Sequence, residues 1–256
     1  MRSLRPLIAY LLRSAIGDRL LAVLALATLA GAAIAAFVGS TALVEKDELT
    51  TVYAATAGRF VVVVCLVLFT CFHVRRTFDS REVDLLLSRP VSRFGFVLAE
   101  VATLVLLAGI GAALAGIAVA ATGRPEPAAL GLWTLSLMVE AAIAATAALF
   151  FALMLSSGLA AALACFGFYV LARLIGLLGG IAAAHGGSGP AGWLADQVVL
   201  LLGLVLPRLD LLARSSWLVH GVDGDIAGLG LILAQSALYL VVLTAAACID
   251  FERRAL

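Results

Sequence analysis

The sequence predicts an all-α, polytopic membrane protein with about six transmembrane helices. Of its 256 residues, 64% are hydrophobic and only 13% are charged, whereas soluble domains are nearer half apolar and a quarter charged. Long apolar runs recur along the chain, and a helix of roughly 20 residues crosses the hydrocarbon core of a bilayer. The runs are apolar on every face, which disfavours the alternating strands of a membrane barrel.

Residues 1–18 precede the first apolar run and have the spacing of a helix. Apolar residues recur at i, i+3 and i+4, namely Leu4, Leu7, Ile8, Leu11, Leu12 and Ala15. Arg2, Arg5 and Arg13 occupy another face. We expect an amphipathic helix that lies on the membrane surface in contact with lipid; the alternative is a frayed basic tail. The next run exceeds the apolar core of a signal peptide, so it is predicted to be retained.

Six spans are predicted at residues 20–40, 58–74, 95–121, 129–154, 159–181 and 227–249. Their many small residues suit close packing of helices in lipid. Four of the five connections are short or strongly charged, and the fifth, residues 182–226, is long. Within it, residues 190–218 either re-enter the membrane or lie at the outer interface, with Trp193 and Trp217 as interfacial anchors. The whole chain, residues 1–256, is predicted to be a single transmembrane domain.

The basic residues predict the orientation, because cytoplasmic connections of membrane proteins are enriched in Lys and Arg. With the N-terminus inside, the cytoplasmic side carries eleven basic residues: Arg2, Arg5, Arg13, Arg19, Arg75, Arg76, Arg81, Arg89, Arg93, Arg253 and Arg254. The opposite side carries five: Lys46, Arg59, Arg124, Arg208 and Arg214. We therefore expect both termini in the cytoplasm and the 182–226 connection outside.

Several chemical functions find little support in the sequence. A net charge of +1 gives no reason to expect nucleic acid as a partner. The cysteines, Cys65, Cys71, Cys165 and Cys248, lie within apolar runs, and the three histidines share no helical face, so we expect no metal site. No GxxxxGK[ST] phosphate-binding loop occurs, and Lys46 is the only lysine. The chain is therefore not expected to be an enzyme or to bind a cofactor.

The connection at residues 75–93 carries most of the functional information. Residues 78–88 are predicted to form a short helix with Asp79 or Ser80 as its N-cap. Pro90 disfavours helix at the residue before it and forces a turn. Arg81, Glu82 and Asp84 can face a soluble partner. A short charged helix held between two spans is suited to transmit motion from a cytoplasmic motor to the membrane helices.

The stretch REVDLLLSRPVSRFGFVLAE, residues 81–100, resembles the coupling-helix segment of ABC-2-type transporter permeases. The positions that match are Glu82, Leu85, Leu86, Pro90 and Arg93. The six predicted spans, the amphipathic N-terminal helix and the segment LVLPRLDLL in the long outer connection are also similar to this family. One departure is that the family often has a lysine near the position of Glu100.

The resemblance implies a permease subunit that pairs with a separate ATPase, which would bind ATP and Mg²⁺, and with a second permease subunit in a homodimer or heterodimer. It implies contact with that ATPase through Arg81, Glu82, Asp84, Leu85, Leu86, Pro90 and Arg93. Export of an unidentified substrate across a bacterial cytoplasmic membrane follows from the same resemblance.

Three other classes stay open at this stage. An ion-coupled secondary transporter usually shows internal repeats, and none is clear in this chain. A non-transporting membrane assembly factor needs no further motif. An intramembrane hydrolase would use Ser156 or Ser157 with His185, but that histidine is expected at the opposite face of the membrane. Copurification of an ATPase separates the permease from all three.

Two predicted spans each contain one charge, Glu140 and Arg173. Isolated charges at that depth are costly and are usually paired. Glu140 lies 16 residues before Ser156, and Arg173 lies 16 residues after Ser157, so a hairpin about this turn brings them to similar depths. We predict an ion pair that fixes the hairpin. The alternatives are a role in substrate binding or gating, and two charges that face water without pairing.

Overall fold

The structure is a computed structural model that describes residues 4–41, 45–80, 93–185, 197–198, 201–203, 205–221 and 226–253. Within these residues all regular structure is helical. Six helices are long and apolar enough to cross a membrane, and they are α2 (Leu20–Thr41), α3 (Lys46–Asp79), α5 (Arg93–Gly123), α6 (Pro127–Met154), α7 (Gly158–His185) and α10 (Ile226–Arg253). The predicted class, an all-α polytopic membrane protein, is confirmed.

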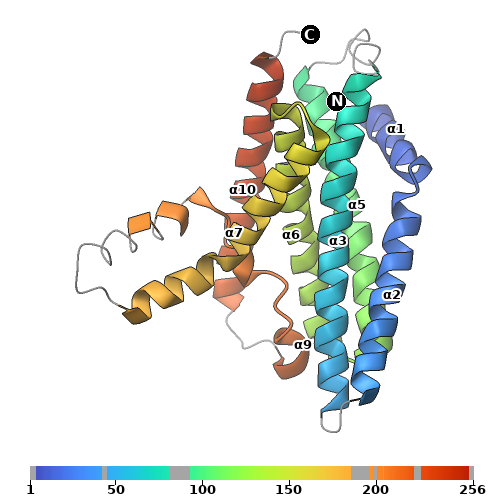
Figure 1. Ribbon diagram of the computed structural model, residues 1–256, viewed down its shortest axis with the longest axis vertical. Coiled ribbons are helices and arrows are strands. Elements are labelled where there is room, and N and C mark those ends of the chain that lie inside the picture. Colours follow the sequence, from blue (N-terminus) through green and yellow to red (C-terminus); the bar gives the residue numbers. More distant parts are fainter. Residues whose placement is uncertain are drawn as a thin grey trace.

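Helix α6 forms the centre of the bundle, and α3, α5, α7 and α10 pack around it (Figure 1). In its most apolar stretch 72% of the residues are buried, against 17% in α2 and in α10. The central part of α6, residues 141–148, consists mostly of buried alanines. Small side chains allow neighbouring backbones to approach closely, which is how helices gain contact energy in lipid.

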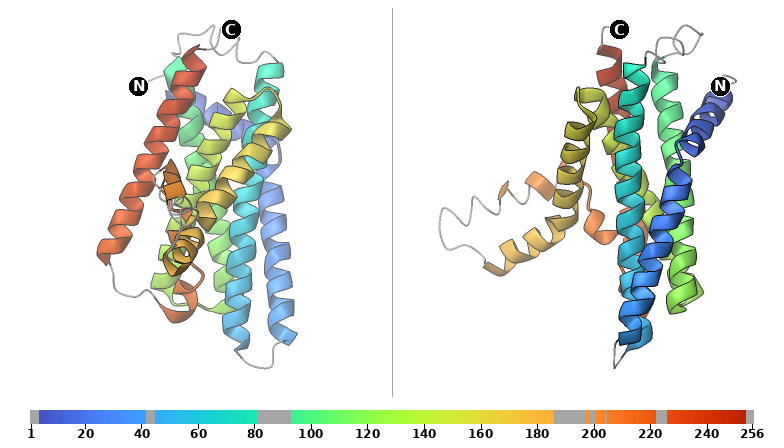
Figure 2. Two further views of the ribbon diagram at one scale, coloured as in Figure 1. Left: turned by 60° about the vertical axis from the view of Figure 1, so that its left-hand side comes forward. Right: turned by 45° about the vertical axis from the view of Figure 1, so that its right-hand side comes forward.

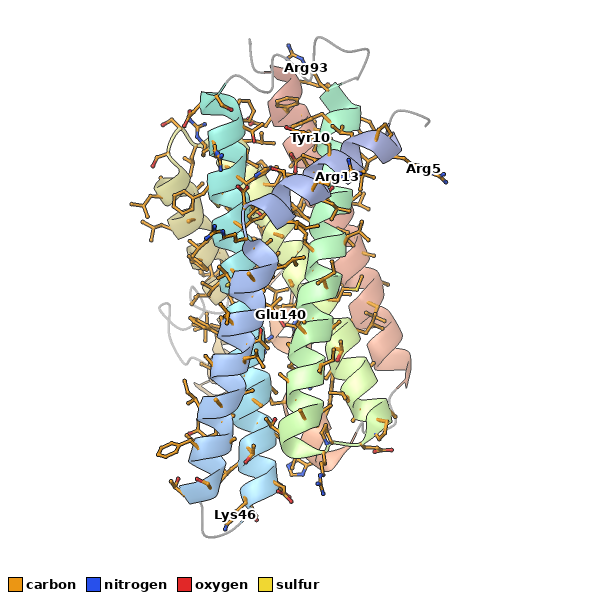
Figure 3. All side chains as sticks on the ribbon, turned by 90° about the vertical axis from the view of Figure 1, so that its right-hand side faces the viewer. Arg5, Tyr10, Arg13, Lys46, Arg93 and Glu140 are labelled. Atoms are coloured by element: carbon orange, nitrogen blue, oxygen red, sulfur yellow. The ribbon has the colours of Figure 1, made fainter. Side chains whose placement is uncertain are left out.

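The helices α1 (Leu4–Gly17) and α2 meet at an elbow, and α1 runs obliquely across one end of the bundle (Figure 3). Leu7, Leu11 and Ala15 are buried against the bundle, whereas Arg5 and Arg13 are exposed. The predicted amphipathic helix is therefore present. The described parts of α1 and α10 place both chain ends at the same end of the bundle (Figures 1 and 2), which we call the termini end.

Two expected boundaries are wrong, and both errors concern α3. This helix has 34 residues, or about 51 Å at the rise of an α-helix, and it exceeds the roughly 30 Å of a hydrocarbon core. Its first turn includes Asp47 and Glu48, which were expected in a connection. At its other end α3 continues through Asp79, with Ser80 as its C-cap, whereas a separate helix was expected to begin at residue 78; the rest of that expected helix, residues 81–88, lies outside the described residues. Because α3 is longer than the hydrocarbon core of a bilayer, its charged end residues can be helical and still lie outside that core.

The long connection before α10 returns into the bundle. Helix α7 leans away from the other helices along its course (Figures 1 and 2). The described residues 206–221 then contain only a short 3₁₀ turn, η1 (Leu209–Leu211), and one helical turn, α9 (Trp217–His220). Leu206, Leu209 and Leu212 are buried in a cluster with Ile143 of α6 and Ala172 of α7. This packing brings the segment back against α6 and α7, and we therefore call residues 205–213 the re-entrant segment.

Candidate functional site

Most residues expected to contact an ATPase fall outside the part of the chain that the structure describes. These are Arg81, Glu82, Asp84, Leu85, Leu86 and Pro90. Arg93, the seventh, is the first residue of α5. Its Nη1 donates hydrogen bonds to the carbonyl oxygens of Phe251, at 3.4 Å, and Glu252, at 3.3 Å. The last carbonyls of a helix lack intrahelical partners, so Arg93 caps the end of α10.

The aromatic ring of Phe251 joins the two ends of the stretch between α3 and α5. Phe251 is fully buried. Its ring centroid lies 6.1 Å from that of Phe78, in the last turn of α3, and 5.7 Å from that of Phe96, near the start of α5. The end of α3, the start of α5 and the end of α10 are therefore packed into one unit at the termini end.

Two arginines connect the end of α3 to the remaining helices. Arg75 Nη1 donates to the carbonyl oxygen of Leu155 at 3.3 Å, in the turn between α6 and α7. Arg76 Nη1 pairs with Asp18 Oδ1 at 3.0 Å, at the elbow between α1 and α2. An open cleft of about 690 Å³ lies between the end of α3 and the α6–α7 turn. We call the set Arg75, Arg76, Phe78, Arg93 and Phe251 the terminal hub.

The predicted pair of intramembrane charges is present. Arg173 Nη1 lies 3.2 Å from Glu140 Oε1, and the Glu140 side chain is 0% exposed. The hydroxyl of Tyr169 donates to the same carboxylate oxygen at 2.6 Å. Glu140 is near the middle of α6 and lies inside the bundle (Figure 3). The equal offsets from the Ser156–Ser157 turn therefore predicted a real contact.

The same arginine also binds the backbone of the re-entrant segment. Arg173 Nη1 donates to the carbonyl oxygens of Leu209 and Leu212, the second at 2.9 Å. From α3, Arg59 Nη1 donates to the carbonyl oxygen of Ala213 at 3.1 Å. Non-helical backbone at membrane depth requires such partners, because lipid offers none. We call Arg59, Glu140, Tyr169 and Arg173 the buried cluster.

A glycine of α7 makes room for the segment. The carboxylate of Asp210, which pairs with Arg208 at 3.1 Å, lies against Gly176. A Cβ atom at position 176 would overlap Asp210 Oδ2. One turn further along α7, a Cβ at Gly180 would meet no atom of the described residues within 4 Å. The close approach of the segment to α7 therefore depends on Gly176 and not on Gly180.

Sequence reasoning missed three residues of this region. Tyr169 precedes Arg173 by four residues and Ser136 precedes Glu140 by four, so both were visible from i, i+4 spacing. Arg59 was expected at a membrane surface because its span was predicted to begin at residue 58. The actual start of α3 at Lys46 places Arg59 well inside the helix, within electrostatic range of Glu140 and Arg173.

No protein-family model matches the chain, and no curated protein sequence matches it. Among the described residues, no three His, Cys, Asp or Glu side chains are grouped so as to hold a metal ion. The features that bear on function are therefore the resemblance at residues 81–100, the terminal hub and the buried cluster.

Proposed function

We propose that the chain is the permease subunit of an ABC transporter and forms the membrane pathway for an exported substrate. A separate ATPase subunit would bind ATP and Mg²⁺, and a second permease subunit would complete the pathway. The ATPase would dock on the segment between α3 and α5. This is the segment whose sequence resembles the coupling helix of ABC-2-type permeases.

The terminal hub is the observation that supports the proposal best. A docked ATPase must move several helices at once when it hydrolyses ATP. The two helix ends that flank the proposed docking segment pack on Phe251 of α10, through Phe78 of α3 and Phe96 of α5. The last turns of α3 also contact the α1–α2 elbow through Arg76 and the α6–α7 turn through Arg75. A displacement applied at this segment therefore reaches every other membrane helix through direct contacts.

Charge reversal in the proposed docking segment tests this function. The variant with Glu82→Lys and Asp84→Lys should lose a copurifying ATPase, or keep it with ATP hydrolysis uncoupled from transport. The matched control is Asp47→Lys with Glu48→Lys, which reverses two acidic residues at the opposite end of α3 and should retain both. Both variants are purified from native membranes and assayed for Mg²⁺-dependent ATP hydrolysis. A fully bound and coupled ATPase in the first variant contradicts the proposal.

The proposed location is a bacterial cytoplasmic membrane with both termini in the cytoplasm. It is supported by the sequence count of basic residues, with eleven on the termini side against four on the other once Arg59 is assigned to the buried cluster. Single cysteines at positions 254 and 47, in a chain whose own cysteines are replaced, report the orientation in intact cells. An impermeant thiol reagent should label position 47 from outside and leave position 254 unlabelled. Labelling at position 254 from outside reverses the assignment.

The buried cluster favours a second candidate, an ion-coupled secondary transporter. Such carriers place charged residues and interrupted helices near the membrane midplane, and Glu140 next to the re-entrant segment has this arrangement. Proteoliposomes that contain the chain alone distinguish the two candidates. Proton or sodium flux that disappears in Glu140→Gln, without any ATPase, supports the carrier. Its absence, together with ATP hydrolysis in the copurified complex, supports the permease.

A further inference from the structure

Residues 206–213 run as mostly non-helical backbone in the interior of a bundle of long helices. The apolar side chains of this segment, Leu206, Leu209 and Leu212, are buried against α6, α7 and α10. Its backbone groups bond to side chains beside Glu140, near the middle of α6. At the level of Glu140 the rest of the described bundle is helical, because a helix satisfies its own backbone hydrogen bonds. The non-helical segment must therefore find its hydrogen-bond partners on other elements.

Four different helices hold this segment, each through one side chain. Arg59 of α3 and Arg173 of α7 donate to its carbonyls. Ser136 Oγ of α6 accepts from the backbone N–H of Ala213 at 3.0 Å, and the Tyr239 hydroxyl of α10 donates to the carbonyl of Leu206 at 3.0 Å. These attachments use side chains and leave the hydrogen bonds of the four helices intact. Release of these four bonds would therefore leave the helices themselves intact.

Ala213 is the strained point of the segment. Its φ is 46°, in the left-handed region that residues with a Cβ rarely adopt. Such a conformation persists only where the surroundings enforce it, and it occurs often in clamps and switches. Here Ser136 binds the N–H of Ala213 and Arg59 binds its C=O. Loss of these two bonds allows the backbone to relax, which favours withdrawal.

Departure of the segment would change the balance of charge around the buried cluster. In place, it offers the carbonyls of Leu209, Leu212 and Ala213 to the two arginines of the buried cluster. Arg208 and Asp210 belong to the segment, pair with each other and leave with it. Among the described residues of the buried cluster, two guanidinium groups would then remain with the carboxylate of Glu140. An excess positive charge in a site shielded from water attracts anions strongly.

We propose that residues 206–213 are a plug, and that the plug occupies a site for an anionic group of the transported molecule. The three carbonyl oxygens of the plug stand where the oxygens of a carboxylate, sulfonate or phosphate would accept the same hydrogen bonds. That the bound molecule is transported rests on the proposed function. The plug and the preference for anions rest only on the contacts within this chain.

Thiol labelling at Ser136, which is 3% exposed behind the plug, tests the proposal. Ser136→Cys is introduced after Cys65, Cys71, Cys165 and Cys248 are replaced by alanine, and the full chain is placed in lipid nanodiscs. Two reagents of opposite charge are compared, anionic sulfonatoethyl and cationic trimethylammonioethyl methanethiosulfonate. Each rate is divided by the rate of that reagent with free 2-mercaptoethanol. Thr146→Cys, fully buried in the same helix, reports any general loosening and should stay unlabelled.

The anionic reagent should label Ser136→Cys at a measurable rate, and its normalised rate should exceed that of the cationic reagent on the order of ten-fold. Adding Arg59→Gln should accelerate labelling by either reagent about ten-fold, as expected when one charge-assisted hydrogen bond to the plug is lost. It should also reduce the preference for the anionic reagent. Arg124→Gln removes an exposed arginine at the end of α5 and should change neither rate.

Each contrary result has a definite meaning. No labelling of Ser136→Cys in the otherwise intact chain shows that the segment is a fixed part of the fold and overturns the plug. Labelling with equal normalised rates, or a faster cationic reagent, overturns the anion site. The assay needs no ATPase, so it can succeed where the proposed function fails. In that case the chain has a gated anion site but is not an ABC permease.

Discussion

The terminal hub and the buried cluster both connect several helices, but they do so in different surroundings. In the hub, the Arg76 side chain is 75% exposed and that of Asp18 is 29% exposed. In the cluster, Glu140 is fully buried and Arg173 is 21% exposed. Exposed pairs contribute little, because water and salt compete for both partners. A buried pair is costly to break, because one charge is left without a partner.

The difference in solvent exposure suits the hub and the cluster to different roles. The hub combines weak ion pairs with aromatic packing around Phe251, so its contacts can shift while the helices stay together. The buried cluster holds one arrangement strongly, and any alternative arrangement must supply new partners for its charges. The hub is therefore suited to receive motion from a docked ATPase. The buried cluster is suited to switch between two distinct arrangements, with the plug in place and with the plug withdrawn. Variants in each region should differ accordingly.

The largest loss is expected for Arg173→Gln. It leaves Glu140 buried without its cation and the carbonyls of Leu209 and Leu212 without their charged donor. Breaking a buried pair typically costs about 3–5 kcal/mol. The free energy of unfolding, measured by titration with SDS in mixed micelles, should fall by that order.

A double-mutant cycle sharpens this expectation. Glu140→Gln with Arg173→Gln should cost less than the sum of the single changes. Exchanging the two residues should restore only part of the loss, because a carboxylate at position 173 cannot donate to the plug. Additive losses would show that Glu140 and Arg173 do not stabilise each other.

The second largest loss is expected for Phe251→Ala in the hub. Phe251 is fully buried between Phe78 and Phe96, and removing a buried phenylalanine side chain costs about 3 kcal/mol or more through lost contacts and a cavity. The copurified ATPase should hydrolyse ATP with weaker coupling to transport. Phe94→Ala, at a side chain that is 52% exposed, is the control and should change neither property. Equal effects of both changes would exclude a special role for the hub.

Much of the fold was predictable, because one physical signal dominates it. Long apolar runs specify membrane helices almost independently of tertiary contacts, and the pattern of Leu7, Leu11 and Ala15 specified α1. The ends of α3 were less predictable. Asp47 and Asp79 are charged residues of the kind expected in a connection, yet both belong to α3, Asp47 in its first turn and Asp79 as its last residue. Hydropathy reports burial in lipid and not the end of a helix.

The buried cluster was half predictable for a similar reason. Glu140 and Arg173 are isolated charges in apolar runs, and their pairing was predictable because a charge at that depth is costly without a partner of opposite sign. The hydrogen bonds from Arg173 to the carbonyls of Leu209 and Leu212 were not predictable, because backbone carbonyls leave no mark in a sequence. The path of the re-entrant segment is set by tertiary packing, such as Asp210 against Gly176. Such a contact becomes visible only when the fold is known.

A smaller effect is expected for Gly176→Ala. The added methyl group overlaps Asp210 and should displace the plug, with a loss of about 1–3 kcal/mol as for other overpacked sites. Gly180→Ala, one turn away in open space, should be neutral or stabilise by about 0.5–1 kcal/mol through helix propensity. Both values come from the same SDS titration. A loss at position 180 as large as that at position 176 would contradict the proposed contact.

The smallest effect is expected for Asp18→Asn at the α1–α2 elbow. Asp18 pairs with Arg76 at 3.0 Å and contacts His73 at 3.4 Å, but these side chains are partly open to water, and such pairs contribute about 0–1 kcal/mol. The loss should shrink further at high salt, because screening already weakens the pair in the parent protein. Asp47→Asn, at the far end of α3, is the control and should show no loss at any salt concentration. A loss near that of Arg173→Gln, unaffected by salt, would mean that the elbow is held as rigidly as the buried cluster, and the division between an adaptable hub and a two-state cluster would fail.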